Sequence, residues 1–332
     1  MTPTISVVIP TYKSAPWIEQ TIGSVLEQTY PREHLELIVV DDASPDATIA
    51  VARKLLEASG LKHQFIVREK NMGVGVNRNA GWRAATGDWI QFLDHDDVLM
   101  PHKLKLQAEC AAQVPGEVGV IYSSWRSLEL IDGSWQQTGP VKAPNVDDDI
   151  VPGILCEHAF GYVGPSLIRK TAVSAVGGFT EIPNLGEDTD LMLRIAIAGW
   201  TFRQAVSEGQ AFLYRQTPGS LWKSYSRNLS ALWNLLQTFR SGEQFLRQQQ
   251  ADGGLRPDVR RALAAQYGRR AQFFLEREPE KFRIIQTWLD DLGYPVPPDL
   301  GRSMELASRL LGFRNAVRLR AKYVGLRDQL RE

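Results

Sequence analysis

The stretch of sequence that decides the fold runs from residue 89 to residue 97 and reads WIQFLDHDD. Residues 89–93 are mostly large and apolar, which predicts a short buried strand. Three aspartates follow at once. In an α/β fold, the carboxyl ends of the strands form the crevice in which ligands bind. We therefore predict a ligand site directly after this strand.

Asp94 and Asp96 alternate by two, so both side chains can face one crevice. Carboxylates at this spacing suit a hard divalent cation, which in turn binds phosphates. The carboxylates also repel one another unless a cation or a proton compensates. The alternative is an acidic helix N-terminus before Pro101, which accounts for Asp97 better than for the other two. We therefore predict that a Mg²⁺ or Mn²⁺ ion binds here and neutralises a diphosphate.

Two earlier strands end in the same way. Residues 5–12 read ISVVIPTY, and residues 35–42 read LELIVVDD. A hydroxyl such as that of Thr11 can contact a base or a ribose, and the carboxylates of Asp41 and Asp42 can accept hydrogen bonds from either. Polar strand caps are the plainer interpretation, and these residues alone leave both open.

Strand and helix patterns alternate through the first 113 residues. The predicted strands cover 5–9, 35–40, 65–67 and 89–93, and the predicted helices cover 17–28, 46–58, 75–85 and 101–113. We expect Ser44 to be the N-cap of the second helix, with Pro45 at its first position. This order implies a parallel sheet with helices on both faces.

The pattern changes after residue 118. We expect strands over 118–123, 126–131 and 161–168, and helices over 170–176 and 188–198. Asp132 and Gly133 predict a hairpin turn. Residues 138–153 carry three prolines and an Asp run, which predicts a mobile surface loop.

Two further motifs carry functional residue types. Residues 71–81 read NMGVGVNRNAG, where glycines permit close approach and Arg78 is placed to face a nucleotide. An ordinary Gly-rich turn explains this motif equally well. Glu187 and Asp188 begin a predicted helix, which fits simple N-capping. It also fits a carboxylate that takes a proton from an acceptor hydroxyl, and both explanations stay open.

The bulk composition excludes several classes of protein. Of the 332 residues, Lys+Arg and Asp+Glu are 38 each, so no global charge favours nucleic acid. Two cysteines form neither a disulfide framework nor a zinc motif. The N-terminal residues lack signal-peptide features, and no apolar run has transmembrane length. We therefore expect a cytoplasmic protein, with peripheral contact at the inner face of the membrane as an option.

Beyond about residue 220 the sequence predicts helices, over 222–239, 258–276, 280–291 and 303–330. We place a domain boundary there, between residues 1–220 and a helical region of residues 221–332.

The last part of this region, residues 302–332, holds eight Lys or Arg against three acids. Leu306, Leu310, Phe313 and Val317 fall on one face of the predicted helix, and we expect them to be buried against protein. The alternatives are a basic helix lying on an anionic membrane and self-association between copies.

The motifs IPTYK, VVDDAS, NMGVGVNRNAG, FLDHDD and GEDTDLMLR occur in this order. Together they resemble the motif set of the family-2 glycosyltransferases, over roughly residues 4–220. The resemblance implies a GT-A fold, which is an α/β fold with a mixed, mainly parallel sheet. Residues 1–117 would form its nucleotide-binding half and residues 118–220 its acceptor half.

The resemblance also implies roles for individual residues. Asp188 would be the catalytic base of a reaction that inverts the anomeric carbon. Asp96 would be the ligand of Mn²⁺ or Mg²⁺, and Glu187 and Arg215 would contact the acceptor or the diphosphate. The nucleotide would be bound by Pro10, Thr11, Tyr12, Asp41, Asp42, Arg78 and Asp94. The leading donor is a UDP-sugar, and the acceptor is a glycan or a lipid-linked molecule in polysaccharide assembly.

One departure from the family pattern concerns the metal site. The family pattern Tyr-Arg-x-His-x-x-Ser reads YRQTPGS at residues 214–220, so Thr217 replaces a histidine that could bind metal or phosphate. This motivates an alternative function, a nucleotide-sugar-binding protein with reduced or lost turnover. A nucleotidylyltransferase is disfavoured, because residues 11–14 read TYKS rather than a Gly-rich basic loop.

Overall fold

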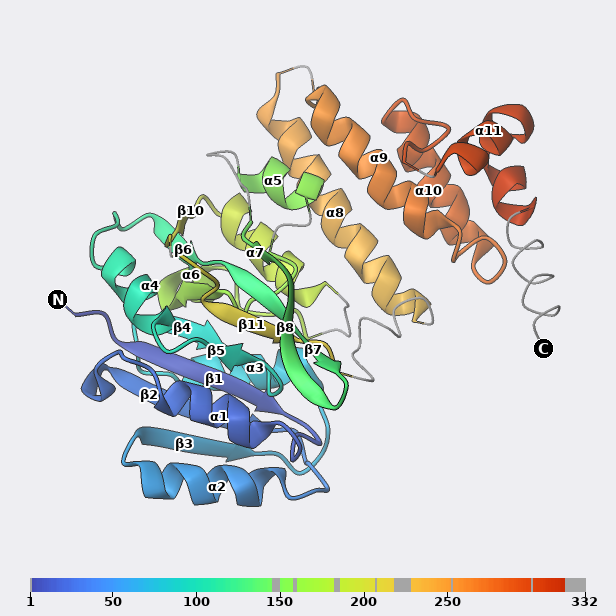
Figure 1. The fold of residues 1–332 in the computed structure, drawn as a ribbon. Coiled ribbons are helices and arrows are strands. Elements are labelled where there is room, and N and C mark those ends of the chain that lie inside the picture. The colour runs from blue at the N-terminus through green and yellow to red at the C-terminus, as the bar shows by residue number, and fades with distance from the viewer. Residues whose placement is uncertain are drawn as a thin grey trace. The chain divides into compact units, whose positions relative to one another are not determined.

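The computed structural model describes residues 2–144, 150–157, 160–181, 186–206, 208–217, 228–251, 253–299 and 301–319. The chain forms two compact units, Met1–Ile154 with His158–Leu221 and Leu155–Glu157 with Trp222–Glu332. The first unit is an α/β unit with two sheets, and the second is helical (Figure 1).

The main sheet of the first unit has seven strands in the order β10-β6-β9-β4-β1-β2-β3. Its parallel half consists of β1 (Ile5–Thr11), β2 (Leu35–Asp41), β3 (Lys62–Val67) and β4 (Trp89–Phe92). The connecting helices are α1 (Ile18–Leu26), α2 (Thr48–Ser59), α3 (Val74–Ala84) and α4 (Lys103–Ala111). The predicted parallel order of alternating strands and helices is confirmed.

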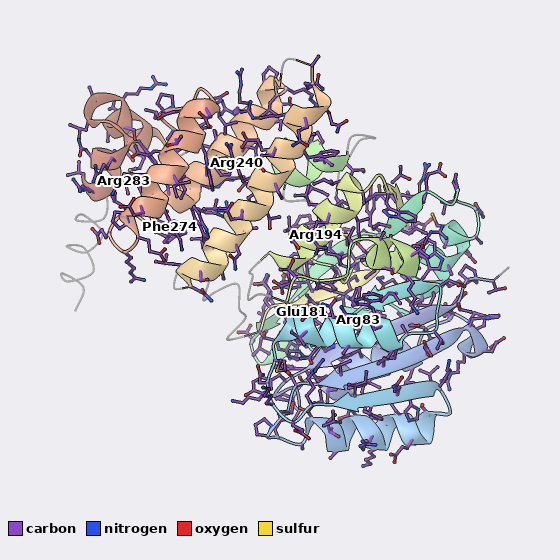
Figure 2. All side chains as sticks on the ribbon, turned by 180° about the vertical axis from the view of Figure 1, so that it is seen from behind. Arg83, Glu181, Arg194, Arg240, Phe274 and Arg283 are labelled. Atoms are coloured by element: carbon purple, nitrogen blue, oxygen red, sulfur yellow. The ribbon has the colours of Figure 1, made fainter. Side chains whose placement is uncertain are left out.

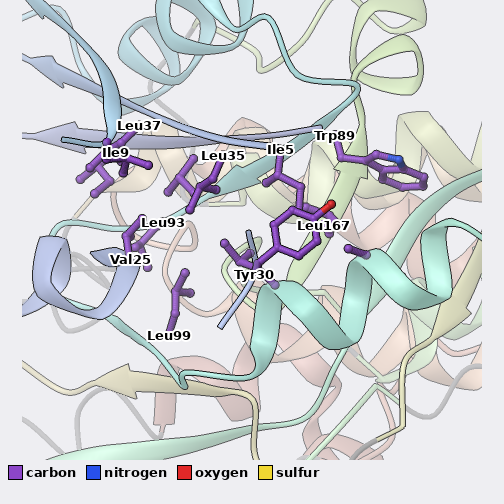
Figure 3. Packing of buried hydrophobic residues seen from close by; sticks show 14 of the residues in the cluster. Ile5, Ile9, Val25, Tyr30, Leu35, Leu37, Trp89, Leu93, Leu99 and Leu167 are labelled. Carbon is purple, nitrogen blue, oxygen red and sulfur yellow. The ribbon is translucent and has the colours of Figure 1, made fainter. Parts of the chain in front are cut away.

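The core follows from the alternation of side chains along β1. Ile5 and Ile9 point to the face covered by α1, α2 and α4, where they meet Leu35, Val25 and their neighbours (Figure 3). Val8 points to the opposite face, against α3. A Cβ on Gly81 of α3 would lie 2.2 Å from Val8 Cγ1, so this helix packs directly on the sheet only because residue 81 is glycine.

Three later strands extend the sheet and make it mixed: β6 (Val118–Tyr122), β9 (Ser166–Arg169) and β10 (Thr201–Gln204). β9 lies between β4 and β6 and runs antiparallel to both. Its start therefore lies at the edge where β4 ends. The helices α6 (Lys170–Ala175) and α7 (Glu187–Ile197) follow it. The predicted mixed, mainly parallel sheet is confirmed.

A second sheet has the order β5-β11-β7-β8. Its strands are β5 (Val98–Leu99), β7 (Trp125–Ile131), β8 (Ser134–Lys142) and β11 (Phe212–Arg215). The predicted loop over residues 138–153 is wrong at both ends, since β8 continues to Lys142 and α5 covers Ile150–Glu157. β8 is an edge strand paired with β7, and an edge strand tolerates Pro140. Residues 145–149 lie outside the described part of the chain.

The predicted capping role of Ser44 is also wrong. Its hydroxyl donates to Asp41 Oδ1 at 2.6 Å, so Ser44 belongs to the end of β2. Helix α2 begins later, at Thr48, whose N–H donates to Asp46 Oδ1 at 3.1 Å.

The second unit contains α8 (Leu229–Gln249), α9 (Pro257–Ala271), α10 (Pro279–Asp291) and α11 (Arg302–Leu311). In this unit, Figure 2 labels Arg240 of α8, Arg283 of α10, and Phe274, which lies between α9 and α10. Inside it, Glu243 is fully buried and accepts hydrogen bonds from Arg240 Nη1 at 2.6 Å and from the Tyr267 hydroxyl at 2.9 Å. This buried carboxylate is therefore fully compensated.

The predicted helix over residues 303–330 is interrupted. Helix α11 ends at Leu311, and Gly312 takes a φ of 79°, which breaks the helix before a second helical stretch at residues 313–319. Phe313 and Val317 are buried as predicted, but Leu306 and Leu310 are exposed. Residues 320–332 lie outside the described residues. Among those described, no helix is long and apolar enough to cross a membrane.

Candidate active site

The carboxyl ends of β1, β2 and β4 meet at one edge of the main sheet. β1 and β2 are in parallel register, with Thr11 beside Asp41. β4 also runs parallel to β1 and leads directly into residues 94–97. The structure thus brings the three predicted polar strand ends to the same edge.

Asp41 is 1% exposed and fastens the end of β2 to its surroundings. Its Oδ1 accepts hydrogen bonds from the hydroxyls of Thr11 at 2.9 Å and Ser44 at 2.6 Å. Its Oδ2 accepts from the Ser44 N–H at 2.9 Å. The buried hydroxyl of Thr11 is thereby engaged within the protein, as is the whole Asp41 carboxylate.

Asp42 is buried to the same degree and holds the Gly-rich loop. Its two oxygens accept the N–H groups of Met72 at 2.7 Å and Gly73 at 2.8 Å. Gly73 needs its φ of 92° to enter α3, a conformation that L side chains rarely adopt. Tyr12 and Met72 lie at this edge and are 39% and 43% exposed. Apolar surface for a ligand therefore comes from Tyr12 and Met72, while the Asp42 carboxylate shapes the loop.

Arg78 of α3 is the centre of the site. It is 2% exposed, and its guanidinium contacts three carboxylates. Nη2 donates to Asp94 Oδ1 at 2.7 Å, Nη1 donates to Asp188 Oδ1 at 2.7 Å, and Nη1 lies 3.5 Å from Glu187 Oε1. Its Nε is buried without a hydrogen-bond partner among the described residues. One arginine thus joins the end of β4 to the start of α7.

The acid pair begins α7 after Gly186. Asp188 Oδ2 accepts the N–H of Val163 at 3.0 Å, just before β9. Burial raises the pKa of Asp188 to about 6, and Asp94 adds to this while Arg78 opposes it. Burial and the Asp188 charge raise the pKa of Glu187 to about 7. Two acids with raised pKa values in a site are candidates for proton transfer.

Contacts away from the reacting edge orient this helix. Arg194 donates to Asp190 Oδ2 and to the Val176 carbonyl, both at 2.7 Å, which ties α7 to the end of α6 (Figure 2). Asn79 binds the Phe179 backbone, and Arg83 lies 3.6 Å from Glu181 (Figure 2). The acid pair is therefore placed by α3 and α6 as well as by its own helix.

Asp96 and Asp97 lie beside the loop that follows β11. Asp97 Oδ1 accepts the Arg215 N–H at 2.8 Å, and Asp96 Oδ2 accepts the Thr217 hydroxyl at 3.2 Å. Burial, reinforced by the Asp94 charge, raises the pKa of the Asp96 carboxyl. Burial and the neighbouring Asp96 and Asp94 charges raise the pKa of Asp97 well above its usual range. A cation here would relieve this repulsion.

Arg215 is 1% exposed and braces the same loop. Its Nε donates to the Asp96 carbonyl at 2.5 Å, and its guanidinium lies 4.5 Å from the ring centre of Trp135 and 5.3 Å from that of Trp17. Its Nη1 is buried with no partner among the described residues. Arg215, which was predicted to contact the ligand, is thus already held by contacts within the protein. Its Nη1 is left as a hydrogen-bond donor that could serve a ligand.

The donor set at this edge fits a divalent metal. No group of three or more His, Cys, Asp or Glu side chains forms a metal site in the described ranges. Mg²⁺, however, is usually held by one or two carboxylates together with substrate phosphates. Asp96, the partly exposed Asp94 and the Thr217 hydroxyl supply oxygen ligands of the right kind.

Two features of the site were not predicted from the sequence. Trp17, at the start of α1, and Trp135 of β8 pack against each other beside Arg215, and residues so far apart in the sequence give no local pattern. A buried polar cluster lies under β4, where Lys103 donates to Gln107 Oε1 at 2.6 Å and Gln91 donates to the Gly164 carbonyl at 2.8 Å. Burial lowers the pKa of Lys103 well below its usual range. The polar Gln91 inside the apolar run of residues 89–93 was the available clue.

Comparison with known proteins shows to which family the chain belongs. The family model described as Glycosyl transferase family 2 matches residues 6–162. The chain is 30% identical over 258 residues to the succinoglycan biosynthesis protein ExoO of Rhizobium meliloti (strain 1021), covering 76% of this chain and 70% of ExoO. It is 29% identical over 241 residues to the amylovoran biosynthesis glycosyltransferase AmsB of Erwinia amylovora, covering 69% and 75%.

Solved structures agree in fold. S. aureus TarS 1-349 in complex with UDP-GlcNAc has a TM-score of 0.65 and 18% identity, with 96% of this chain and 92% of that chain covered. The mannosyltransferase PcManGT from Pyrobaculum calidifontis, in complex with GDP-Man and Mn²⁺, has a TM-score of 0.51 and 19% identity, with 91% and 89% covered. The chain belongs to glycosyl transferase family 2 and is a glycosyltransferase with the GT-A fold.

Proposed function

We propose that the protein is an inverting, metal-dependent glycosyltransferase that moves a sugar from a nucleotide diphosphate sugar to an acceptor hydroxyl. The observation that carries this proposal is the pair of ion pairs made by Arg78. This arginine joins Asp94, the first acid of the D-x-D motif formed by residues 94–96, to Asp188, an acid with a raised pKa. A carboxylate beside the proposed metal ligand Asp96 and a candidate base are thereby held by one arginine.

The donor binds at the end of the parallel strands in this proposal. Tyr12 and Met72 offer exposed apolar surface for the base, and the Gly-rich loop held by Asp42 borders it. Thr11, Asp41 and Pro10 shape this edge. A UDP-sugar is the leading donor, supported by the TarS complex with UDP-GlcNAc, while the PcManGT complex with GDP-Man makes a GDP-sugar the next to test.

Asp96 holds the metal in this scheme, with Asp94 and Thr217 beside it. When bound, Mn²⁺ or Mg²⁺ would neutralise the diphosphate and make it a better leaving group. The uncommitted Nη1 of the buried Arg215 supports a further contact to a phosphate oxygen, because a buried donor without a partner is costly. Because Arg215 is buried, its guanidinium is held in place before the nucleotide sugar binds.

Asp188 acts as the general base. Its carboxylate takes the proton of the acceptor hydroxyl while that oxygen bonds to the anomeric carbon, and the bond from this carbon to the diphosphate oxygen breaks. A single displacement of this kind inverts the configuration. A pKa of about 6 leaves Asp188 ionised at neutral pH yet more basic than an ordinary aspartate. Glu187 lies next to it and is placed to contact the acceptor.

The relatives support a proposal for the pathway. ExoO and AmsB are named for succinoglycan and amylovoran biosynthesis, and the "Putative teichuronic acid biosynthesis glycosyltransferase TuaG" of Bacillus subtilis (strain 168) is 37% identical over 107 residues, which cover 32% of this chain and 41% of TuaG. We therefore propose a cytoplasmic role in polysaccharide assembly on a glycan or lipid-linked acceptor. Residues 118–220 would serve the acceptor, with residues 221–332 as a separate helical region.

The alternative function, nucleotide-sugar binding without turnover, rests on Thr217. The structure gives this residue a hydrogen bond to Asp96, so the loop still reaches the D-x-D without a histidine. The acid pair is also intact, which favours an active enzyme.

A donor screen tests the proposal. Purified protein is incubated with UDP-glucose, UDP-galactose, UDP-N-acetylglucosamine or GDP-mannose, with Mn²⁺, Mg²⁺ or EDTA, and nucleoside diphosphate release is measured. We expect release from one donor, dependent on metal. Asp188→Asn should keep donor affinity and lower kcat by about 10²–10⁴-fold, because a general base acts in the transition state.

Asp290→Asn is the matched control, since Asp290 is exposed in the helical unit. Near-normal kcat in Asp188→Asn would remove that residue from catalysis. Donor binding without release under any metal, in the wild type, would favour the binding-protein alternative. Retained anomeric configuration in the product would rule out the single displacement.

A further inference from the structure

Helix α11 exposes leucines on the face turned away from its own core. Leu306 and Leu310 are 61% and 75% exposed and lie four residues apart, so they share one face. Met304 and Ser308 occupy the opposite face and are 8% and 1% exposed. The inner face is therefore already packed, and the two leucines project into water.

The exposure of apolar groups continues around the helix break. Leu311 and Leu319 are 49% and 54% exposed, although Phe313 and Val317 between them are buried. Exposed apolar side chains that share one helix face can mark a surface that binds a partner or a membrane. We call the face of α11 that carries Leu306 and Leu310 the leucine surface.

Every charged residue from 306 to 319 is basic. Arg309, Arg314 and Arg318 are exposed, and Arg309 follows Leu306 by three positions on the same side of α11. Residues 301–319 contain four arginines and a single acid, Glu305.

We infer that the leucine surface docks the protein on an anionic lipid membrane. The combination of exposed leucines and arginines matches an interfacial helix, whose apolar side chains enter the acyl boundary while cations meet lipid phosphates. Charge argues against a second copy of the chain, because a symmetric contact would bring the arginines of both copies together. A nucleic acid would use the arginines but would leave the leucines in water.

Vesicle binding by the full chain tests this inference without any donor, so its outcome is independent of the proposed reaction. The protein is sedimented with vesicles of phosphatidylcholine alone or mixed with phosphatidylglycerol. We expect binding to the mixed vesicles only, weakened by salt. Leu306→Ser/Leu310→Ser should reduce the partition coefficient about tenfold or more. Arg309→Gln/Arg314→Gln/Arg318→Gln should reduce it about a hundredfold, since each basic residue near the surface adds about fivefold.

Leu130→Ser is the matched control, because Leu130 is 52% exposed on β7. It should leave binding unchanged, and the leucine variants should keep the wild-type melting temperature, because these side chains are exposed. Equal binding to both kinds of vesicle, or binding that the leucine and arginine variants do not alter, would overturn the inference. So would a concentration-dependent dimer that Leu306→Ser/Leu310→Ser dissociates, which would assign the surface to a second copy.

Discussion

Two acidic clusters follow β2 and β4, the parallel strands on either side of β1, and differ in how their charge is compensated. In Asp41 and Asp42, every carboxylate oxygen accepts a hydrogen bond from a backbone N–H or a hydroxyl. In the second cluster, burial and mutual repulsion raise the pKa values of Asp96 and Asp97. The same residue type at the same kind of position thus fixes loops in one case and leaves mutually repelling carboxylates in the other, which fits the proposed metal site.

The largest expected effect tests the second cluster. Asp96→Ala should lower turnover by about a thousandfold or more, because a bound metal contributes several kcal/mol of charge stabilisation. It should also abolish the Mn²⁺ dependence of nucleoside diphosphate binding, measured by calorimetry. Folding stability at neutral pH should stay the same or rise, since the variant removes one of several repelling buried carboxylates. Unchanged metal-dependent affinity would remove Asp96 from the metal site.

The opposite outcome is expected for the first cluster. Asp42→Ala leaves the part-buried N–H groups of Met72 and Gly73 without their acceptor, and a hydrogen bond to a charged group contributes about 1.5–3 kcal/mol. We expect a loss of about 2–4 kcal/mol in the free energy of unfolding, measured with urea, and weaker donor binding with an unchanged metal dependence. If Asp42→Ala and Asp96→Ala destabilise the fold equally, the contrast between the clusters fails.

Glu187 extends the comparison to pH. Its pKa is raised to about 7, so the folded protein holds this proton more tightly than the unfolded chain does. The carboxylate therefore lowers stability as the pH rises from about 4.5 to 7 and above. Glu187→Gln should raise the free energy of unfolding by about 1–3 kcal/mol at pH 8 and change it little at pH 4. The reverse pattern, a gain only in acid, would mean that Glu187 is stabilised as a carboxylate.

The smallest expected effect concerns Thr217. Thr217→His should tighten Mn²⁺ about tenfold in the presence of nucleoside diphosphate, because imidazole is a better ligand for this class of metal than a hydroxyl group. Thr217→Val is the control, since it removes only the hydroxyl that binds Asp96. Metal titration of diphosphate binding compares the three proteins. Equal affinities in all three would place residue 217 outside the metal site.

The fold of residues 1–117 could be predicted because its signals are local. Each apolar run ends in a polar residue, and the alternation of strand and helix dictates a parallel order. The position of β9 could not be predicted, since antiparallel insertion between β4 and β6 depends on pairing across the chain. The pairing of β8 with β7 overrode its Pro and Gly signals for the same reason.

The candidate site shows the same division. Acids at strand ends predicted that these residues meet at one edge of the sheet, and the structure places them together there. The hydrogen bonds that engage Asp41 and Asp42 could not be predicted, because their donors come from a neighbouring strand and from loops distant in the sequence. Arg78 and Asp188 are 110 residues apart in the sequence, so their contact could be seen only in the structure. The exposure of Leu306 and Leu310 likewise could not be predicted, because Met304 and Ser308 occupy the packed face of α11 instead.

The antiparallel placement of β9 has a consequence for how the chain is made. As the nascent chain leaves the ribosome, β1 to β4 can assemble as soon as they emerge, but one edge of β4 has no partner until Ser166–Arg169 follow. An open strand edge is a template for pairing with other chains. A fragment that stops at residue 117 would keep that edge permanently, so residues 1–117 should aggregate when they are expressed alone.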